Sequence, residues 1–226
     1  MRAVITFLFL SGVGLVVIGT AFGQGNKGAM VASSPVSPEN PAMIIQRAST
    51  QFIEALNRHE AQIKKNPQEI DKLVHKYLLP HFDLSFTTRL VLGHYWSVST
   101  PAQRKAFSQA FIHYLLAVYA KGIASYHSAK VQVLPLQGGA SRQFVSVATL
   151  VQVPNSQPVA VDYAMHRVFG SWKIFDVKVM GISFVLTYRD QYQDEIKQTS
   201  LTALIKRLQH VQSPKSVTVL AAATSG

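Results

Sequence analysis

The sequence predicts an α+β fold, in which a helical N-terminal half and a long central helix pack on a twisted four-stranded antiparallel sheet that C-terminal helices close. Three observations predict this class. Apolar residues recur at three- and four-residue steps up to about residue 126. β-branched runs separated by short turns then fill residues 130–180, and the helical spacing returns after Gly181.

The first 41 residues carry signals for export rather than for folding. Residues 1–23 contain one basic residue, Arg2, then an apolar run that ends with small residues around Ala21 and Gly23. This order predicts a cleaved secretory signal peptide. An uncleaved anchor is the alternative, because the run nearly reaches the length that spans a bilayer. Residues 24–41, which are rich in glycine, serine and proline, are expected to form a flexible mature N-terminus.

Three helices are expected before the central one. The first covers residues 42–64, with apolar side chains along one side. The second starts at Asn66 and ends at Pro80, because proline cannot continue a helix. Asp83 can cap the third, which Gly93 closes in the left-handed conformation typical of helix C-termini.

The central helix has a well-specified start. Thr100 is a favourable N-cap, Pro101 suits the first helical position, and Gln103 stands where a capping-box partner returns to the cap. One wide apolar face follows, made of Phe107, Ala110, Phe111, Tyr114, Leu115, Val118, Tyr119, Ile123 and Tyr126. This face suits a solid core or the wall of a pocket. Buried tyrosine hydroxyls need partners and Gly122 leaves space, which favours a partly wet boundary without deciding between the two.

The sheet is expected to be an antiparallel meander. Strands are predicted over residues 130–136, 142–153, 159–168 and 171–180, and the connections between them are short. In the third strand the apolar residues share one face and two polar residues share the other, as in a sheet with one buried side. The apolar set is Val159, Val161, Tyr163 and Met165, and the polar set is Asp162 and His166.

Two closing helices are expected after the sheet, over residues 182–192 and 201–208. A long helix laid against a twisted sheet makes a cone, as in nuclear-transport-factor-like folds, and such cones often enclose an apolar cavity. Residues 42–212 are therefore predicted to form a single domain. The tail, residues 213–226, has no pattern and is expected to be disordered.

The amino-acid composition excludes several classes of protein and of site. The chain has no cysteine, which excludes a lipid-modified cysteine, a disulfide scaffold, a cysteine nucleophile and a thiolate metal site. An exported chain without disulfides fits the periplasm of a Gram-negative bacterium. The formal net charge of +11 suits nucleic acid, anionic lipid surfaces or acidic protein partners. Export argues against nucleic acid, and scattered lysines and arginines are also typical of a merely solvated surface.

Signals for catalysis, metals and cofactors are weak. The eight histidines include no pair at helical i, i+4 spacing, and His59-Glu60 lacks the second histidine of a zinc-protease motif because position 63 is isoleucine. No nucleophile elbow, phosphate-binding loop or dinucleotide motif occurs. No catalytic residue, metal or cofactor is therefore expected. Asp162, His166 and Asp176 on the sheet are the alternative, as acid–base groups of a cone-fold enzyme that acts on a small hydrophobic molecule.

Three segments carry a resemblance to a known family. They are NPQEIDKLVHKYLLPHFDL at residues 66–84, LVLGHYWSVSTPAQRKAFSQAFIHYLLAVY at 90–119 and FDVKVMGISFVLTYRDQY at 175–192. Together they resemble the MlaC/toluene-tolerance auxiliary family of phospholipid ABC transport systems, which is similar over residues 42–210. One position departs from the family's pattern, since the residue before Gly181 is commonly acidic there and is Met180 here.

The resemblance implies a periplasmic, monomeric carrier that is not an enzyme. It would hold phospholipid acyl chains in an apolar pocket and shuttle lipid between an outer-membrane lipoprotein complex and an inner-membrane ABC transporter complex. The concave sheet face, the central helix and the start of the first closing helix are expected to line this pocket. The candidate lining residues are Phe111, Tyr114, Leu115, Val118, Val145, Val147, Val161, Tyr163, Ile182 and Val185.

Three alternatives remain open beside the phospholipid carrier. A branch of the same family accompanies hopanoid biosynthesis, so the ligand can be a hopanoid or another apolar lipid. A cone-fold enzyme would need a carboxylate or histidine with a raised pKa facing the cavity. A structural or adaptor protein would have a filled core and no ligand.

Overall fold

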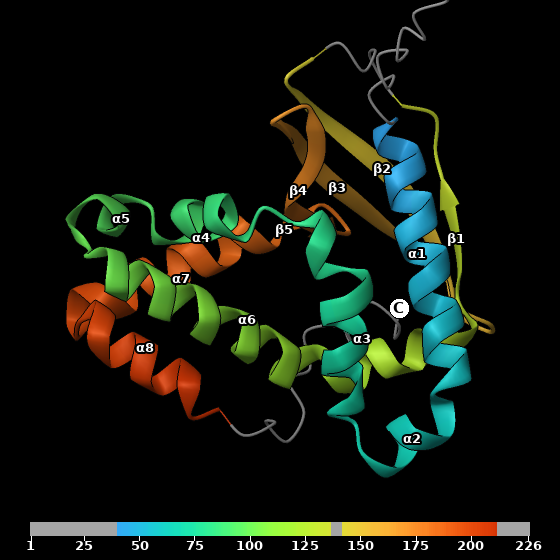
Figure 1. Ribbon diagram of the computed structural model, residues 1–226, viewed down its shortest axis with the longest axis horizontal. Coiled ribbons are helices and arrows are strands. Elements are labelled where there is room, and N and C mark those ends of the chain that lie inside the picture. The colour runs from blue at the N-terminus through green and yellow to red at the C-terminus, as the bar shows by residue number, and fades with distance from the viewer. Residues whose placement is uncertain (1–39, 137–141, 212–226) are drawn as a thin grey trace, which may run out of the picture. The chain divides into compact units, whose positions relative to one another are not determined.

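The elements follow the predicted order, with helices before and after an antiparallel sheet, but the helices have more interruptions. A computed structural model describes residues 40–136 and 142–211, within one compact unit, Val36–Gly226 (Figure 1). The predicted signal peptide, nearly all of the predicted mature N-terminus and the predicted tail lie outside the described residues and remain predictions.

The first predicted helix is divided into two. α1 (Pro41–Arg58) begins with the side chain of Asn40, which accepts the N–H of Ala42 at 2.9 Å. The backbone leaves the helical region at His59, and α2 (Glu60–Lys65) follows. The break lets α2 turn away from the axis of α1, and its single buried residue joins the cluster between α1 and α3.

Two short helices and a 3₁₀ turn lead to the central helix. They are α3 (Glu69–Tyr77), η1 (Leu79–His81) and α4 (Leu84–Leu92). The predicted cap is confirmed, because Asp83 Oδ1 accepts the N–H of Phe86 at 2.9 Å. Gly93 ends α4 at φ +52°, and an unpredicted helix, α5 (His94–Val98), follows directly.

α6 (Pro101–Ala124) has the predicted capping box, and η2 (Ser125–Ser128) continues from it. The Gln103 N–H donates to Thr100 Oγ1 at 3.2 Å, and the Thr100 N–H donates to Gln103 Oε1 at 3.0 Å. Apolar residues lie on more than the one predicted face. The reason is that α6 stands between two clusters, one shared with α4, α7 and α8 and the other with α1 and α3.

Within the described residues, the sheet has five strands in sequential antiparallel order rather than four. The four predicted strands are present as β1 (Lys130–Val133), β2 (Phe144–Gln152), β3 (Val159–Val168) and β4 (Ser171–Val179). The fifth, β5 (Ile182–Ser183), pairs with the end of β4 through a two-residue turn. Both turn residues, Met180 and Gly181, have positive φ, which matches the twist of a tight hairpin. Sequence alone missed this strand because two residues are too few for an alternating pattern.

The second face of the sheet is also partly covered, contrary to the prediction of one buried side. His166 and Asp176 are each only 8 % exposed. The start of α4 covers His166, because the Asp83 N–H donates to Ile174 O at 2.8 Å and the Phe86 ring stacks on His166. The start of α7 covers Asp176, which accepts hydrogen bonds from Ser183 and Val185.

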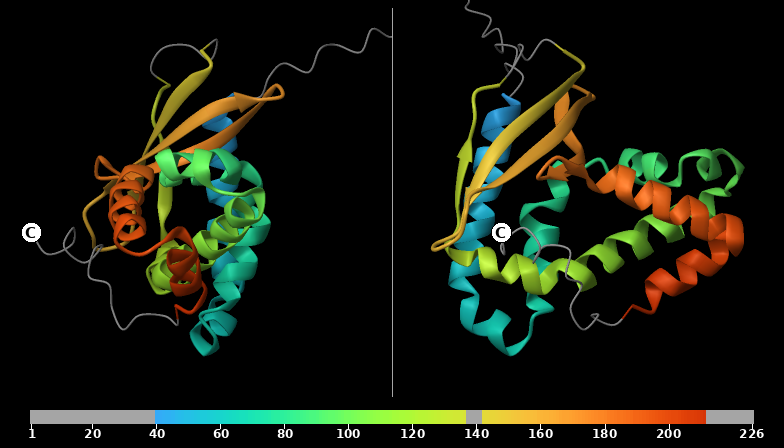
Figure 2. Two further views of the ribbon diagram at one scale, coloured as in Figure 1. Left: turned by 90° about the vertical axis from the view of Figure 1, so that its left-hand side faces the viewer. Right: turned by 180° about the vertical axis from the view of Figure 1, so that it is seen from behind.

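Two closing helices complete the chain and belong to a separate helical layer. α7 (Phe184–Gln198) and α8 (Leu201–Gln209) lie beside α6 (Figure 2). α1 instead lies along β1 and β2 and buries its first turns against the sheet (Figure 1). The result is a helical end with a filled core and a sheet end where α1, α3 and α6 enclose space.

Candidate binding cavity

A cavity of about 390 Å³ lies between the sheet, α1, the η1–α4 segment, the C-terminal half of α6 and the start of α7. Its lining is almost entirely aliphatic and aromatic, and it draws on residues from Ile45 to Val185. Ligand pockets of this size and apolar character are typical sites for small hydrophobic molecules.

Residues of four strands, β1 to β4, form the sheet wall. Val161 and Tyr163 of β3 pair in register with Val179 and Val177 of β4, and Val151 belongs to the same face of β2. Side chains two residues apart share a face, so a continuous apolar surface results.

Polar groups interrupt this wall at Asp176 and at the pair Tyr163 and Ser49. The Tyr163 hydroxyl is hydrogen-bonded to Ser49 of α1, which also lines the cavity. Burial raises the pKa of Tyr163 to about 12, and the hydrogen bond to Ser49 offsets part of this effect. A neutral hydroxyl with its partner in place is compatible with an apolar ligand.

The C-terminal half of α6 forms the opposite wall. Leu115, Tyr119 and Ile123 line the cavity there, and the Tyr119 hydroxyl shares a hydrogen bond of 2.9 Å with Tyr188 of α7. Gly122 is the one exposed residue of the lining, and a Cβ at this position would meet no atom within 4 Å. Open space beside Gly122 therefore places the mouth of the cavity next to α6.

Asp176 fixes the start of α7 against the cavity. Its Oδ2 accepts the Ser183 hydroxyl at 2.6 Å and its Oδ1 accepts the N–H of Val185 at 3.1 Å. Ser183 in turn caps α7 by accepting the N–H of Leu186 at 3.0 Å. These bonds hold Val185 in the wall, and both carboxylate oxygens of Asp176 are used for this purpose.

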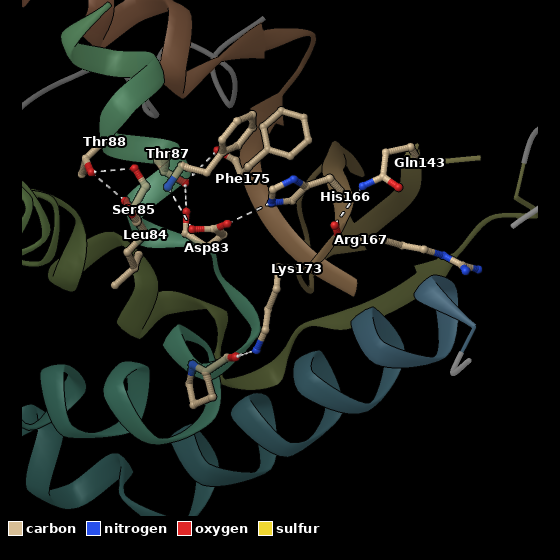
Figure 3. Close-up of polar contacts among 12 residues, drawn as sticks. Asp83, Leu84, Ser85, Thr87, Thr88, Gln143, His166, Arg167, Lys173 and Phe175 are labelled. Atoms are coloured by element: carbon tan, nitrogen blue, oxygen red, sulfur yellow. Dashed lines mark hydrogen bonds and ion pairs between the residues drawn. The ribbon is translucent and has the colours of Figure 1, made fainter. Parts of the chain in front are cut away.

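Asp83 and His166 attach α4 to the sheet in a comparable way (Figure 3). Asp83 Oδ2 lies 3.1 Å from His166 Nε2, while the other oxygen caps α4. The Thr87 hydroxyl donates to the carbonyl of Phe175 in β4 at 2.9 Å. Leu84 and Thr87 thereby come to line the cavity. Of the polar groups that were considered for acid–base chemistry, His166 and Asp176 thus take part in two separate structural contacts. The third, Asp162, does not line the cavity.

The structure brings five of the ten predicted lining residues to the cavity. They are Phe111, Leu115, Val161, Tyr163 and Val185. They come from the three elements that were expected to form the wall.

The other five do not line the cavity. Val145 and Val147 are on the predicted face, but α1 covers that end of the sheet and packs Ile45 against it. Tyr114 contacts the rings of Tyr188 and Tyr192 in the helical core. The remaining two, Val118, which is half-buried on α6, and Ile182, which is 64 % exposed on β5, point elsewhere.

Sequence reasoning did not assign α1 and α3 to the wall. The cavity is lined by Ile45, Ser49 and Phe52 of α1, by Val74 of α3 and by Leu78, the C-cap of α3. The apolar stripes of both helices were visible in the sequence, but a stripe does not distinguish a residue that faces a void from one that faces a neighbour.

Two general features of the described residues bear on the ligand. Within residues 40–136 and 142–211, no helix is both long and apolar enough to cross a membrane. In the same ranges, no group of three or more His, Cys, Asp or Glu residues could hold a metal ion.

Comparison with known proteins gives consistent matches. The family described as MlaC protein matches residues 46–210. The chain is 20% identical to the intermembrane phospholipid transport system binding protein MlaC of Haemophilus influenzae, over 81% of this chain and 87% of that protein. It is 24% identical to the toluene tolerance protein ttg2D of Pseudomonas putida, over 72% of this chain and 76% of that protein.

A solved structure matches as well. The phospholipid-binding protein of Ralstonia solanacearum, in complex with a phospholipid, aligns with a TM-score of 0.71 and 26% sequence identity. The alignment covers 75% of this chain and 95% of that one.

Proposed function

The chain belongs to the MlaC family, and on that premise we propose that it is a periplasmic carrier that holds phospholipid acyl chains in its cavity. The observation that carries the proposal is the apolar cavity itself, built from the sheet, α1, α6 and α7. The phospholipid bound to the Ralstonia relative supports the choice of ligand. The Haemophilus relative, named for intermembrane transport, supports the role of a shuttle.

The energetics suit a reversible carrier. Burial of each methylene contributes about 0.8 kcal/mol, so an acyl chain of roughly fifteen methylenes gains on the order of 12 kcal/mol relative to water. Relative to a bilayer, where the chain is already out of water, the gain is close to zero. A carrier with such a cavity keeps lipid out of water yet can return it to a membrane complex.

The proposal extends to partners and location. The signal peptide at residues 1–23 would direct the chain to the periplasm. There it would accept or deliver lipid at an inner-membrane ABC transporter complex and an outer-membrane lipoprotein complex, working as a monomer. The polar groups near the cavity support a binding role rather than an enzymatic one, because Asp176 and His166 are already hydrogen-bonded to structural partners.

Extraction of the purified protein tests the ligand. The protein would be purified from the periplasm without detergent, extracted with organic solvent and analysed by mass spectrometry. We expect phospholipid at about one molecule per protein chain. A hopanoid in the extract would contradict the phospholipid ligand but not the carrier function. An empty extract in repeated preparations would refute both the ligand and the carrier function.

A blocked mouth tests the site. Gly122→Trp places a large ring in the open space beside α6 and is expected to remove most of the co-purified lipid. Gln109→Trp, on an exposed position of the same helix, is the matched control and is expected to keep the lipid. Equal lipid content in the two variants would contradict the assignment of the mouth.

Photo-crosslinking tests the lining directly. A photoreactive residue at Val161, inside the cavity, is expected to form lipid adducts. The same residue at Ile182, which is exposed on β5, is expected to form few. Adducts at Ile182 alone would mean that the lipid binds outside the cavity.

A further inference from the structure

A second pocket lies between the C-terminal end of α4, the short helix α5 and the middle of α7, and it shares no residue with the cavity. It has a volume of about 560 Å³ and is mainly polar. Its lining is made of Arg89, Leu90, Gly93, His94, Trp96, Ser97, Arg189, Asp190 and Gln193.

The pocket has an excess of positive charge. It contains two arginines, Arg89 and Arg189, against one carboxylate, Asp190. Arg189 Nε is 3.5 Å from Asp190 Oδ1, and the Arg189 side chain is still 41% exposed. Within the described part of the chain, Arg89 has no ion pair. Glu195, one turn further along α7, does not compensate, because it is bound to Arg207 at 2.6 Å.

The walls of the pocket are fixed by local structure. Gly93 joins α4 to α5 at φ +52°, and a Cβ there would come within 2.4 Å of Gln193 Nε2. The Arg104 guanidinium stacks on the Trp96 ring at 4.7 Å, and its Nε donates to the Trp96 carbonyl at 3.0 Å. Trp96 is therefore held in place before any ligand arrives, which lowers the entropic cost of binding.

We propose that this pocket docks an acidic segment of a partner protein, with one carboxylate inserted between Arg89 and Arg189. Guanidinium groups bind carboxylates with two parallel hydrogen bonds, and two arginines with one weak partner leave donors free. Leu90 and Trp96 provide apolar surface for the methylenes of a glutamate side chain. The recess of the pocket suits a protruding side chain better than a flat bilayer. The role of this docking site rests on the proposed carrier function, but the pocket itself shares no residue with the cavity.

The second pocket and the lipid cavity are lined by the same two helices, α4 and α7. α4 lines the cavity with Leu84 and Thr87 and the second pocket with Arg89. α7 does the same with Val185 and Arg189. A partner bound at one end of this helix pair therefore contacts the two helices that form one side of the cavity.

NMR titration of the full chain with a defined acidic probe tests the proposal. The probe is a terminally capped peptide of eight glutamates, and the capped peptide of eight glutamines is its uncharged counterpart. The sequence has two tryptophans, so the indole N–H of Trp96 reports on the pocket while the buried Trp172 serves as an internal reference. We expect a saturable shift of the Trp96 signal with glutamate peptide and none with glutamine peptide.

Charge-matched variants give the decisive comparison. Arg89→Gln/Arg189→Gln is expected to weaken binding about tenfold, because two charge-assisted hydrogen bonds are lost. Lys65→Gln/Lys206→Gln removes the same charge from exposed sites outside both pockets and is expected to change the affinity less than twofold. Equal weakening in both variants would mean general attraction to a basic protein and would overturn the proposal. Absence of a Trp96 shift, or saturation by phosphatidylglycerol vesicles in place of the peptide, would also overturn it.

Lipid content separates this inference from the carrier function. It would be measured in the same samples by solvent extraction, and both double variants are expected to keep wild-type lipid. A protein without lipid that still binds glutamate peptide through the two arginines would refute the carrier and leave the docking site. A protein that holds lipid but does not bind the peptide would refute the docking site and leave the carrier function.

Discussion

The two halves of α6 contain similar apolar residues but have different surroundings. In the N-terminal half, Phe107 and Phe111 stack on each other and meet the rings of Tyr188 and Tyr192 edge-on at 5.2 to 6.1 Å. In the C-terminal half, Tyr119 and Ile123 face the cavity and Gly122 faces open space. The comparison teaches that one helix can serve stability at one end and binding at the other, with Phe111 at the boundary.

The largest expected effect is in the filled half. Phe107 is fully buried, and Phe107→Ala removes its ring from the aromatic cluster. The loss of packing and the cavity left behind are expected to lower the free energy of unfolding by about 3 to 5 kcal/mol. Urea denaturation followed by circular dichroism measures this. A loss below about 1 kcal/mol would mean that this half is no better packed than the other.

The contact of Asp176 with the start of α7 is expected to have the next largest effect on stability. Asp176→Ala leaves the Ser183 hydroxyl and the Val185 N–H without their acceptor, at a cost of about 2 to 3 kcal/mol. Lipid content is expected to fall as well, because α7 loses its anchor beside the cavity. Asp162→Ala, on the same sheet without such bonds, should change stability by less than about 0.5 kcal/mol. Similar losses in both variants would remove the anchoring role of Asp176.

The hydroxyl in the cavity wall is expected to affect stability only at high pH. The pKa of Tyr163 is about 12 in the folded protein, and a tyrosine in the unfolded chain titrates near about 10. The unfolded state therefore loses its proton first, and stability present below about pH 10 is lost as the pH rises towards 12. In Tyr163→Phe, this decrease in the free energy of unfolding with rising pH should be smaller by about 1 to 2 kcal/mol. Denaturation series at pH 9 and pH 11 measure it, and an unchanged difference between the two would contradict the burial of the hydroxyl.

The smallest stability effect is expected at the cavity wall itself. Ile123 is half-buried and faces existing space, so Ile123→Ala loses fewer contacts than a core substitution and should cost about 1 kcal/mol. Its lipid content is nevertheless expected to fall, whereas Phe107→Ala should keep lipid as long as it is folded. If the two variants lose lipid in proportion to their loss of stability, the division of α6 into two functions is wrong.

Local signals in the sequence were sufficient for most of the fold. The capping box at Thr100, the cap at Asp83 and the residue alternation of β3 each depend on neighbours within a few positions, and the structure has all three. The break at His59 and the strand β5 depend instead on distant packing and on a two-residue turn. No local pattern marks them.

The candidate site was harder to predict for a physical reason. The face of β2 that carries Val147 was assigned correctly, but α1 fills the space over it, and this contact joins residues about 100 positions apart. Whether an apolar side chain meets a neighbour or a void is decided by such long-range packing. Periodicity gives the face of a strand or helix, and it does not give what lies opposite.

The cavity is built from parts of the chain that lie far apart in the sequence. Its wall begins at Ile45 and is completed by Val185, and the tie between Asp83 and His166 joins residues 83 positions apart. Contacts of such separation cost conformational entropy to form, because they close a long loop of chain. A chain that ends before α7 would therefore lack one wall, so it would not form a smaller version of the cavity. A cavity that can hold a ligand therefore requires the chain from α1 to the start of α7.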